Sequence, residues 1–278
     1  MIWTFGIAGG VLLLALIGGV FWVNRLFEAP EAEPVASLAG ALGDSRVMTV
    51  FAHPDDEQLV NGLITAAKAE GAYVAQVTAT RGEAGTQVPV VARQRDLGVV
   101  RMAEVLKNGF ALGIDEQEVW DYPDGGLPDV PLEALVARLA EAMSRYRPDL
   151  VVAFWPASGA TGHKDHMRMG LAAGQAIARL RAGTDAYRGP RHIAYALTPV
   201  RAMRTFGGET GRFVADNQPA PSHSVPGNVS SKVKGWDIHA SQGGYVRRTY
   251  GVPARLLYLV WDKEFYAVRD VADERGDE

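Results

Sequence analysis

Short apolar runs alternate with segments of helical periodicity along most of this chain. The apolar runs lie at residues 47–52, 73–80, 118–122, 150–155 and 192–197. Each run is short and is bounded by polar or glycine-containing segments, which is typical of a strand. Apolar side chains recur every three or four positions in residues 58–70, 91–106, 131–146 and 165–181, which predicts helices. Strands that alternate with helices favour a Rossmann-like, three-layer α/β domain with a mostly parallel sheet.

The amino-terminal segment has a different pattern. No charged side chain occurs from Met1 to Asn24, and about 20 apolar residues in a helix span the ~30 Å hydrocarbon core of a bilayer. A cleavable signal peptide would need basic residues before the apolar run and small residues at its end. We therefore predict one uncleaved transmembrane helix over residues 1–24. Arg25 is the nearest cation and favours a single-pass membrane protein whose domain faces the cytoplasm.

Composition divides the rest of the chain. Residues 25–45 are rich in Ala, Pro, Glu and Gly, which predicts a linker. Residues 46–269 carry the alternating pattern and predict one domain, and residues 270–278 predict a charged tail. Within the domain, the stretches at 201–209 and 219–226 predict a long loop.

Charge and cysteine content narrow the chemistry. The formal net charge is −4, so the chain has no global basic field that would attract nucleic acid. It contains no cysteine, which excludes disulfides, thiolate metal ligands and a cysteine nucleophile. Any metal site in this chain must therefore use His, Asp or Glu.

Two polar clusters come after predicted strands. One is HPDDE at residues 53–57, and the other is HKDH at residues 163–166. Either cluster alone is compatible with an ordinary helix start, since proline and acidic residues favour the first turn. Ligands bind beyond the carboxyl ends of strands in open α/β sheets. Two clusters at corresponding strand ends therefore predict one shared site.

The residue types in these clusters suit a hydrolytic zinc site. Such a site uses about three His or carboxylate ligands and keeps one position open for water. His53 and Asp56 are three residues apart and would face the same way on a first helical turn. His166 would complete a His-Asp-His set. Asp55 is then free to act as the general base toward water whose pKa falls to roughly 7 on zinc.

The second cluster offers two further groups. His163 lies three residues before His166 and can face the same site, where it would stabilise an oxyanion or protonate a leaving amine. Asp165 is expected to orient His163 or His166 by accepting a hydrogen bond from the imidazole.

These clusters resemble the motifs of the PIG-L / LmbE-like zinc-dependent de-N-acetylases, a family that includes the N-acetylglucosaminyl-phosphatidylinositol deacetylases. The family motif AHPDDE is intact at residues 52–57, and GHKDH at 162–166 is similar to the family's GHPDH. Further similar segments are TRGEAG at 80–85, RQRDL at 93–97, YPDGG at 122–126, and Lys234 followed by HASQ at 239–242. The resemblance runs in order over roughly residues 46–245.

The resemblance implies zinc at the positions matching His53, Asp56 and His166, although another divalent metal such as Fe²⁺ suits the same ligands. It also implies substrate contacts from the positions matching Arg93 and Asp124.

For the cluster residues outside that ligand set, the family implies Asp55 as the general base and His163 as the partner of the oxyanion or the leaving group. Thr161 stands where some relatives carry a tyrosine near the oxyanion.

Together, the residues and the resemblance predict a zinc-dependent hydrolase that removes an N-acetyl group from an N-acetylglucosamine-type or related amino sugar. The substrate would be a small or lipid-linked N-acyl amino sugar. Two alternatives stay open. One is an amidase that acts on a larger amide conjugate by the same chemistry, and the other is a catalytically inactive, membrane-tethered carbohydrate-binding protein on a retained hydrolase fold. The sequence does not predict the oligomeric state.

Overall fold

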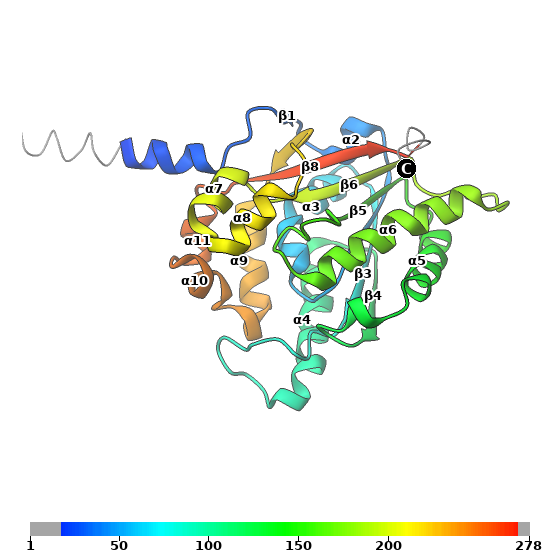
Figure 1. Ribbon diagram of the computed structural model, residues 1–278, viewed down its shortest axis with the longest axis horizontal. Coiled ribbons are helices and arrows are strands. Elements are labelled where there is room, and N and C mark those ends of the chain that lie inside the picture. Colours follow the sequence, from blue (N-terminus) through cyan, green and yellow to red (C-terminus); the bar gives the residue numbers. More distant parts are fainter. Residues whose placement is uncertain (1–17, 272–278) are drawn as a thin grey trace, which may run out of the picture.

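A single mixed sheet organises the molecule. The computed structural model describes residues 18–271. Its eight strands follow the order β1-β7-β8-β6-β5-β2-β3-β4. Strand β8 runs antiparallel to both of its neighbours, and the other adjacent pairs are parallel. The predicted α/β class with a mostly parallel sheet agrees with this arrangement (Figure 1).

The strands begin and end close to the expected residues. They are β1 (Glu33–Pro34), β2 (Arg46–Phe51), β3 (Tyr73–Thr80), β4 (Glu116–Tyr122), β5 (Leu150–Phe154), β6 (His192–Leu197), β7 (His223–Pro226) and β8 (Lys263–Asp270). Strands β2, β3, β5 and β6 form the centre of the sheet and are almost fully buried. Their apolar side chains face helices on both sides, which explains the near-continuous apolar runs in the sequence.

Helices cover both faces of the sheet. The α-helices are α2 (Leu38–Leu42), α3 (Asn61–Ala69), α4 (Leu97–Leu112), α5 (Leu132–Tyr146), α6 (Lys164–Ala182), α7 (Val200–Phe206), α8 (Gly208–Asp216), α9 (Val229–Ile238), α10 (Tyr245–Tyr250) and α11 (Ala254–Leu257). The short 3₁₀ helices are η1 (Asp56–Leu59), η2 (Gln94–Asp96), η3 (Leu127–Asp129) and η4 (Ala240–Gln242). Leu135 and Leu139 of α5 pack with Met169 of α6 on one face. Leu63 and Ile64 of α3 pack on the other face.

A third apolar cluster lies beside the sheet, where α7 to α11 gather at one end of the molecule (Figure 1). Trp236, Leu257, Tyr258 and Trp261 form its centre, and Phe27 packs against it. Because these residues come from the last part of the chain, this cluster joins the carboxyl-terminal helices to the segment that precedes β1.

Helix α4 starts six residues later than the predicted helix at 91–106. The backbone N–H groups of Val91 and Ala92 donate to the side-chain oxygen of Gln87, each at 2.9 Å. Those hydrogen bonds hold the segment as a loop, because they satisfy donors that a helix start would otherwise leave exposed.

The predicted long loop over 201–209 and 219–226 is wrong. Instead, α7 and α8 form a tight helical pair and residues 223–226 form β7. A Cβ added at Gly207 or Gly211 would lie 2.7 or 2.3 Å from the carbonyl oxygen of Met203. The glycines that indicate a loop in the sequence therefore permit close helix packing. Residues 223–226, which end in a proline, form a strand because they pair with β8.

The predicted transmembrane helix over residues 1–24 is also wrong. In the part of the chain that the structure describes, no helix combines the length and apolar character needed to cross a bilayer. The described residues 18–26 are helical. Residues 1–17 of the predicted span lie outside the described residues.

The described part of this helix makes protein contacts. Val23 and Leu26 pack against the cluster that contains Phe27 and Trp261, and the ring of Trp22 contacts Phe206 at 6.4 Å. The predicted single-pass membrane location, its cytoplasmic orientation and the membrane as a partner all depended on the spanning helix, and they are withdrawn with it.

Candidate active site

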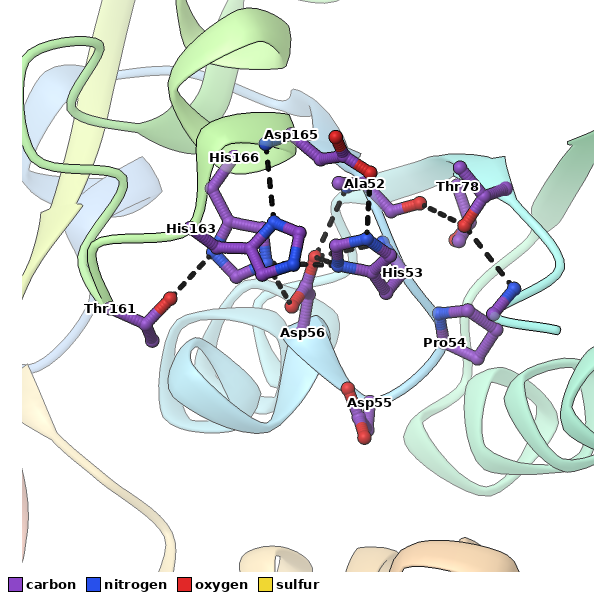
Figure 2. Close-up of polar contacts among 12 residues, drawn as sticks. Ala52, His53, Pro54, Asp55, Asp56, Thr78, Thr161, His163, Asp165 and His166 are labelled. Atoms are coloured by element: carbon purple, nitrogen blue, oxygen red, sulfur yellow. Dashed lines mark hydrogen bonds and ion pairs between the residues drawn. The ribbon is translucent and has the colours of Figure 1, made fainter. Parts of the chain in front are cut away.

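The loop after β2 fixes the carboxylate of Asp56. The backbone N–H groups of Ala52 and His53 donate to Oδ2 of Asp56 at 3.1 and 2.9 Å. Asp55 adopts a φ of 95°, in the left-handed region, which is a strained conformation for a residue with a side chain. As a result, the neighbouring carboxylates of Asp55 and Asp56 point in different directions (Figure 2).

The second loop leads into α6. His163 is the N-cap residue of this helix, and its Nδ1 accepts a hydrogen bond from the backbone N–H of Asp165 at 3.2 Å. His166 lies one turn later on the same helix. Figure 2 shows the rings of His163, His166 and His53 gathered around Asp56, with Asp55 set apart from the group.

Three side chains from the two loops bring their metal-ligand atoms together. His53 Nδ1 lies 3.0 Å from His166 Nε2. Asp56 Oδ1 lies 3.1 Å from His166 Nε2, and Asp56 Oδ2 lies 3.7 Å from His53 Nδ1. All three side chains are buried. Such separations suit ligands of one ion whose bonds are about 2.0–2.2 Å long.

The hydrogen bonds of the two imidazoles define which nitrogens carry lone pairs. Nδ1 of His166 lies 2.9 Å from the carbonyl oxygen of Gly159, so this nitrogen donates and Nε2 keeps its lone pair. Nε2 of His53 lies 3.0 Å from Asp124 Oδ1 and 3.1 Å from Asp165 Oδ2, so it donates and Nδ1 is left as the acceptor. Two lone pairs at 3.0 Å repel unless a positive charge lies between them. The donor set therefore fits a cation.

The electrostatics of the site favour a positive charge beside His53 and Asp56. Burial raises the pKa of Asp56, but the imidazoles of His166 and His53 outweigh burial and hold that pKa below its usual range. Burial lowers the pKa of His53, but hydrogen bonds to Asp124 and Asp165 raise it to about 10. The carboxylates therefore stabilise a cation, whether a proton or a metal ion, beside His53.

Asp165 contacts a different histidine from the expected ones. Its Oδ2 accepts from the backbone N–H of Gly125 at 2.8 Å and lies 3.1 Å from His53 Nε2. The expected side-chain contact with His163 or His166 is not formed, because the carboxylate points from the first turn of α6 toward the loop after β4. Asp165 therefore orients the histidine of the first loop.

An alternative donor set lies on the other side of His53. The ligand atoms of His53, Asp124 and Asp165 lie within 4.8 Å of one another, as do those of His53, His163 and His166. However, Asp165 is 0% exposed and does not line the cavity described below. His53, Asp56 and His166 all line that cavity, so an ion held by these three can keep a position open toward it, as a catalytic zinc requires.

A buried arginine holds the carboxylate of Asp55. Arg101 Nη2 donates to Asp55 Oδ2 at 3.1 Å and to the carbonyl of Pro54 at 2.6 Å, and Nη1 donates to the carbonyl of Gly82 at 2.8 Å. Burial raises the pKa of Asp55 to about 6, while the charge of Arg101 opposes this shift. A Cβ at Gly82 would lie 2.3 Å from the guanidinium, so glycine leaves room for the contact.

Arg101 was not among the predicted site residues. A signal was present, since Leu97, Arg101 and Val105 are four residues apart and all three are buried on α4. An arginine within an apolar helical stripe needs a buried partner.

We expect Arg101→Met to lower kcat about tenfold or more, because Asp55 loses the group that fixes its position. Bound metal should be retained, and Arg101→Lys should recover part of the rate. The matched control is Arg95→Met, since the side chain of Arg95 is 74% exposed. Steady-state kinetics with metal analysis provide the measurement. A folded Arg101→Met variant with unchanged kcat would show that Asp55 needs no such support.

The two positions implied as substrate contacts lie in different places. Asp124 lines the cavity, and its Oδ2 accepts from the backbone N–H of Ala84 at 2.9 Å. Arg93 is exposed at the start of η2 and does not line the cavity. In this structure, Arg101 is the arginine that reaches the site.

One cavity of about 410 Å³ connects these groups. Asp55, Asp56 and His163 line one part of it, and His163 is the most exposed of the three clustered histidines. Burial, followed by the nearby charges of His53 and His166, lowers the pKa of His163. Another wall comes from α9, η4, α10 and the segment after them, none of which was predicted to line the site.

Comparison with known proteins finds a matching family and a similar deacetylase sequence. A family model described as GlcNAc-PI de-N-acetylase (PIG-L) matches residues 48–177. The 1D-myo-inositol 2-acetamido-2-deoxy-alpha-D-glucopyranoside deacetylase of Kineococcus radiotolerans is 31% identical, in an alignment that covers 88% of this chain and 82% of that protein.

Solved structures share the fold. The N,N'-diacetylchitobiose deacetylase from Pyrococcus horikoshii superposes with a TM-score of 0.65 at 19% identity, covering 84% of this chain and 86% of that chain. The zinc-inhibited form of teicoplanin deacetylase Orf2 superposes with a TM-score of 0.53 at 16% identity, covering 82% and 100%. At these identities the likeness establishes the fold, and the activity has to be argued from the site.

Proposed function

The chain belongs to the PIG-L family, GlcNAc-PI de-N-acetylase, and from this membership we propose which residues and which substrate class carry its hydrolytic N-deacetylase activity. The substrate class is an N-acetylglucosamine-type amino sugar, from which the enzyme releases acetate and leaves a free amine. The metal is zinc, held by His53, Asp56 and His166.

One observation carries this proposal. His53 Nδ1 and His166 Nε2 face each other at 3.0 Å with the carboxylate of Asp56 beside them. Asp55, which lies next to Asp56 in the chain, is directed elsewhere into the same cavity. A zinc ion bound by the three ligands would polarise the acetamide carbonyl and lower the pKa of water.

Side chains of the protein then transfer the protons. Asp55 accepts a proton from the attacking water, since a carboxylate whose pKa is raised to about 6 is a stronger base than an ordinary one. When the carbon–nitrogen bond breaks, the sugar nitrogen needs a proton. Asp55 returns to that nitrogen the proton that it took from water. His163 lines the cavity and accepts the Asp165 N–H through Nδ1, so its Nε2–H is the group that can donate to the oxyanion. Asp165 and Asp124 hold His53 through its Nε2 proton so that Nδ1 faces the ion.

Acetate release tests the proposal. Zinc-loaded protein is incubated with N-acetylglucosamine, N,N'-diacetylchitobiose, and an N-acetylglucosaminyl conjugate with a larger acyl group in place of acetyl. We expect acetate and a stoichiometric primary amine from at least one of the acetylated sugars. Cleavage of the larger amide alone would support an amidase, and no cleavage of any substrate would contradict the proposed activity.

A further inference from the structure

A buried histidine lies against the loop after β2, outside the cavity. The Nε2 atom of His239 is 2.5 Å from Oε1 of Glu57, the residue that follows Asp56 in the chain. His239 and Glu57 are each 0% exposed, and neither lines the cavity. His239 comes from the carboxyl-terminal part of the chain, outside the residues 48–177 that the family model matches. Because neither side chain reaches a substrate, the pair can affect the reaction only through a neighbouring group.

Glu57 accepts hydrogen bonds at both of its carboxylate oxygens. Oε2 accepts from the backbone N–H of Asp55 at 3.1 Å. Oε1 accepts from Nδ2 of Asn108 at 2.7 Å and faces Nε2 of His239. Since a carboxylate offers only acceptors, this nitrogen of His239 donates. Two donors therefore fix one oxygen of Glu57, and the other oxygen holds the peptide of Asp55.

The backbone of Asp55 needs such support. Its φ of 95° lies in the left-handed region, and a strained conformation of this kind persists only where the surrounding structure holds it. Arg101 holds the carboxylate of Asp55 at 3.1 Å, and Glu57 holds the peptide N–H. Without the contact to Glu57, the peptide can rotate and carry the carboxylate with it. A misplacement of about 1 Å can lower a rate about 100-fold.

Helix α9 brings His239 to this position. Lys232, Gly235 and His239 are three and four residues apart, so they lie on one face at the end of the helix. Nζ of Lys232 donates to the carbonyl of Gln58 at 2.5 Å, and a Cβ added at Gly235 would lie 2.1 Å from Nε2 of Gln58. Glycine therefore lets α9 pack directly against η1, the short helix that begins after Asp55.

We propose that His239 and Glu57 are positioning residues for the general base Asp55. His239 orients the carboxylate of Glu57, and Glu57 holds the peptide of Asp55 so that the Asp55 carboxylate stays directed into the cavity. The inference rests on the proposed function, in which Asp55 takes the proton of the attacking water. It gives the carboxyl-terminal helices a part in the rate of the reaction.

Three substitutions in the zinc-loaded chain test this role. Glu57→Gln keeps the size of the side chain but replaces one of the two acceptors with an amide nitrogen. His239→Leu removes the donor, and His239→Gln restores a donor of similar reach. The matched control is His192→Leu, since Nδ1 of His192 lies 2.8 Å from the buried carboxylate of Asp44 and His192 does not line the cavity.

Acetate release from N-acetylglucosamine and from N,N'-diacetylchitobiose gives kcat and KM, and metal analysis gives the bound zinc. We expect Glu57→Gln and His239→Leu to lower kcat about 10- to 100-fold and to retain about one zinc ion per chain. KM should change less than about twofold, because neither side chain reaches the substrate. His239→Gln should recover most of the rate, and His192→Leu should keep the rate of the unaltered protein.

A double-mutant cycle with Asp55→Asn separates positioning from a general effect on the fold. If His239 acts through Asp55, adding His239→Leu to Asp55→Asn should lower kcat by less than about a further twofold. The same cycle is run with Glu57→Gln, which removes the buried negative charge instead of leaving it unpaired, in case His239→Leu does not fold. Circular dichroism checks the fold of each variant.

The outcomes separate this inference from the function on which it rests. Unchanged kcat in the folded variants, loss of their zinc, or the same fractional loss with and without the Asp55 carboxylate would each overturn the positioning role while the deacetylase stands. Failure of the unaltered protein to release acetate from both sugars would overturn the proposed function and this inference together.

Discussion

Asp55→Asn is expected to lower kcat for acetate release by about 10²- to 10⁴-fold, the usual contribution of a general base. Asparagine preserves the size of the side chain but cannot accept the proton of the attacking water. The carboxylate of Asp55 lies in the cavity beside the donor set and is directed away from it. The variant should therefore bind about one metal ion per chain, as the unaltered protein does.

Metal analysis of the purified variants and a stopped acetate assay measure the two properties separately. Asp185→Asn is the matched control, since Asp185 is exposed and does not line the cavity. If Asp55→Asn lost its metal, Asp55 would be a ligand rather than the base. If the variant kept its full rate, another group would have to take the proton.

His53→Ala should remove both the metal and the activity. The substitution deletes a donor from the converging set, and it also leaves the buried carboxylates of Asp124 and Asp165 without the imidazole that they contact. Even the loss of a group that only orients a ligand typically costs 10- to 100-fold in metal affinity. Loss of the ligand itself should weaken zinc binding by at least about 100-fold.

Equilibrium competition with a zinc chelator gives the affinity, and circular dichroism checks that the variant is folded. His223→Ala is the control, because His223 lies in β7 and does not line the cavity. Zinc bound with unchanged affinity to folded His53→Ala would be incompatible with the proposed ligand set.

The sequence predicts the sheet well because the local signal and the tertiary environment agree. Strand β3 begins and ends at the predicted residues 73 and 80, and β6 does so at 192 and 197. Both are central strands with helices on each face, so most of their side chains are apolar. The convergence of His53 and His166 was predictable for a related reason, since both follow parallel strands that end at the same edge of the sheet.

Other features depend on long-range contacts that no local pattern contains. Trp236 and Trp261 are separated by 25 positions in the sequence, and only the folding of the carboxyl-terminal helices brings them to the same wall. The partner of Asp165 is another example, because its contact with His53 joins residues 112 positions apart. In the same way, the apolar side chains of Val23 and Leu26 find partners in the protein cluster around Trp261. Hydropathy alone does not distinguish such partners from lipid.

The position of the bound metal tests the central claim most directly. Crystals of the zinc-loaded chain, measured at the zinc absorption edge, locate the ion by anomalous scattering. We predict one ion bonded at about 2.0–2.2 Å to His53 Nδ1, a carboxylate oxygen of Asp56 and His166 Nε2. An ion on the opposite side of His53, between Asp124 and Asp165, or no ion at this site would contradict the account.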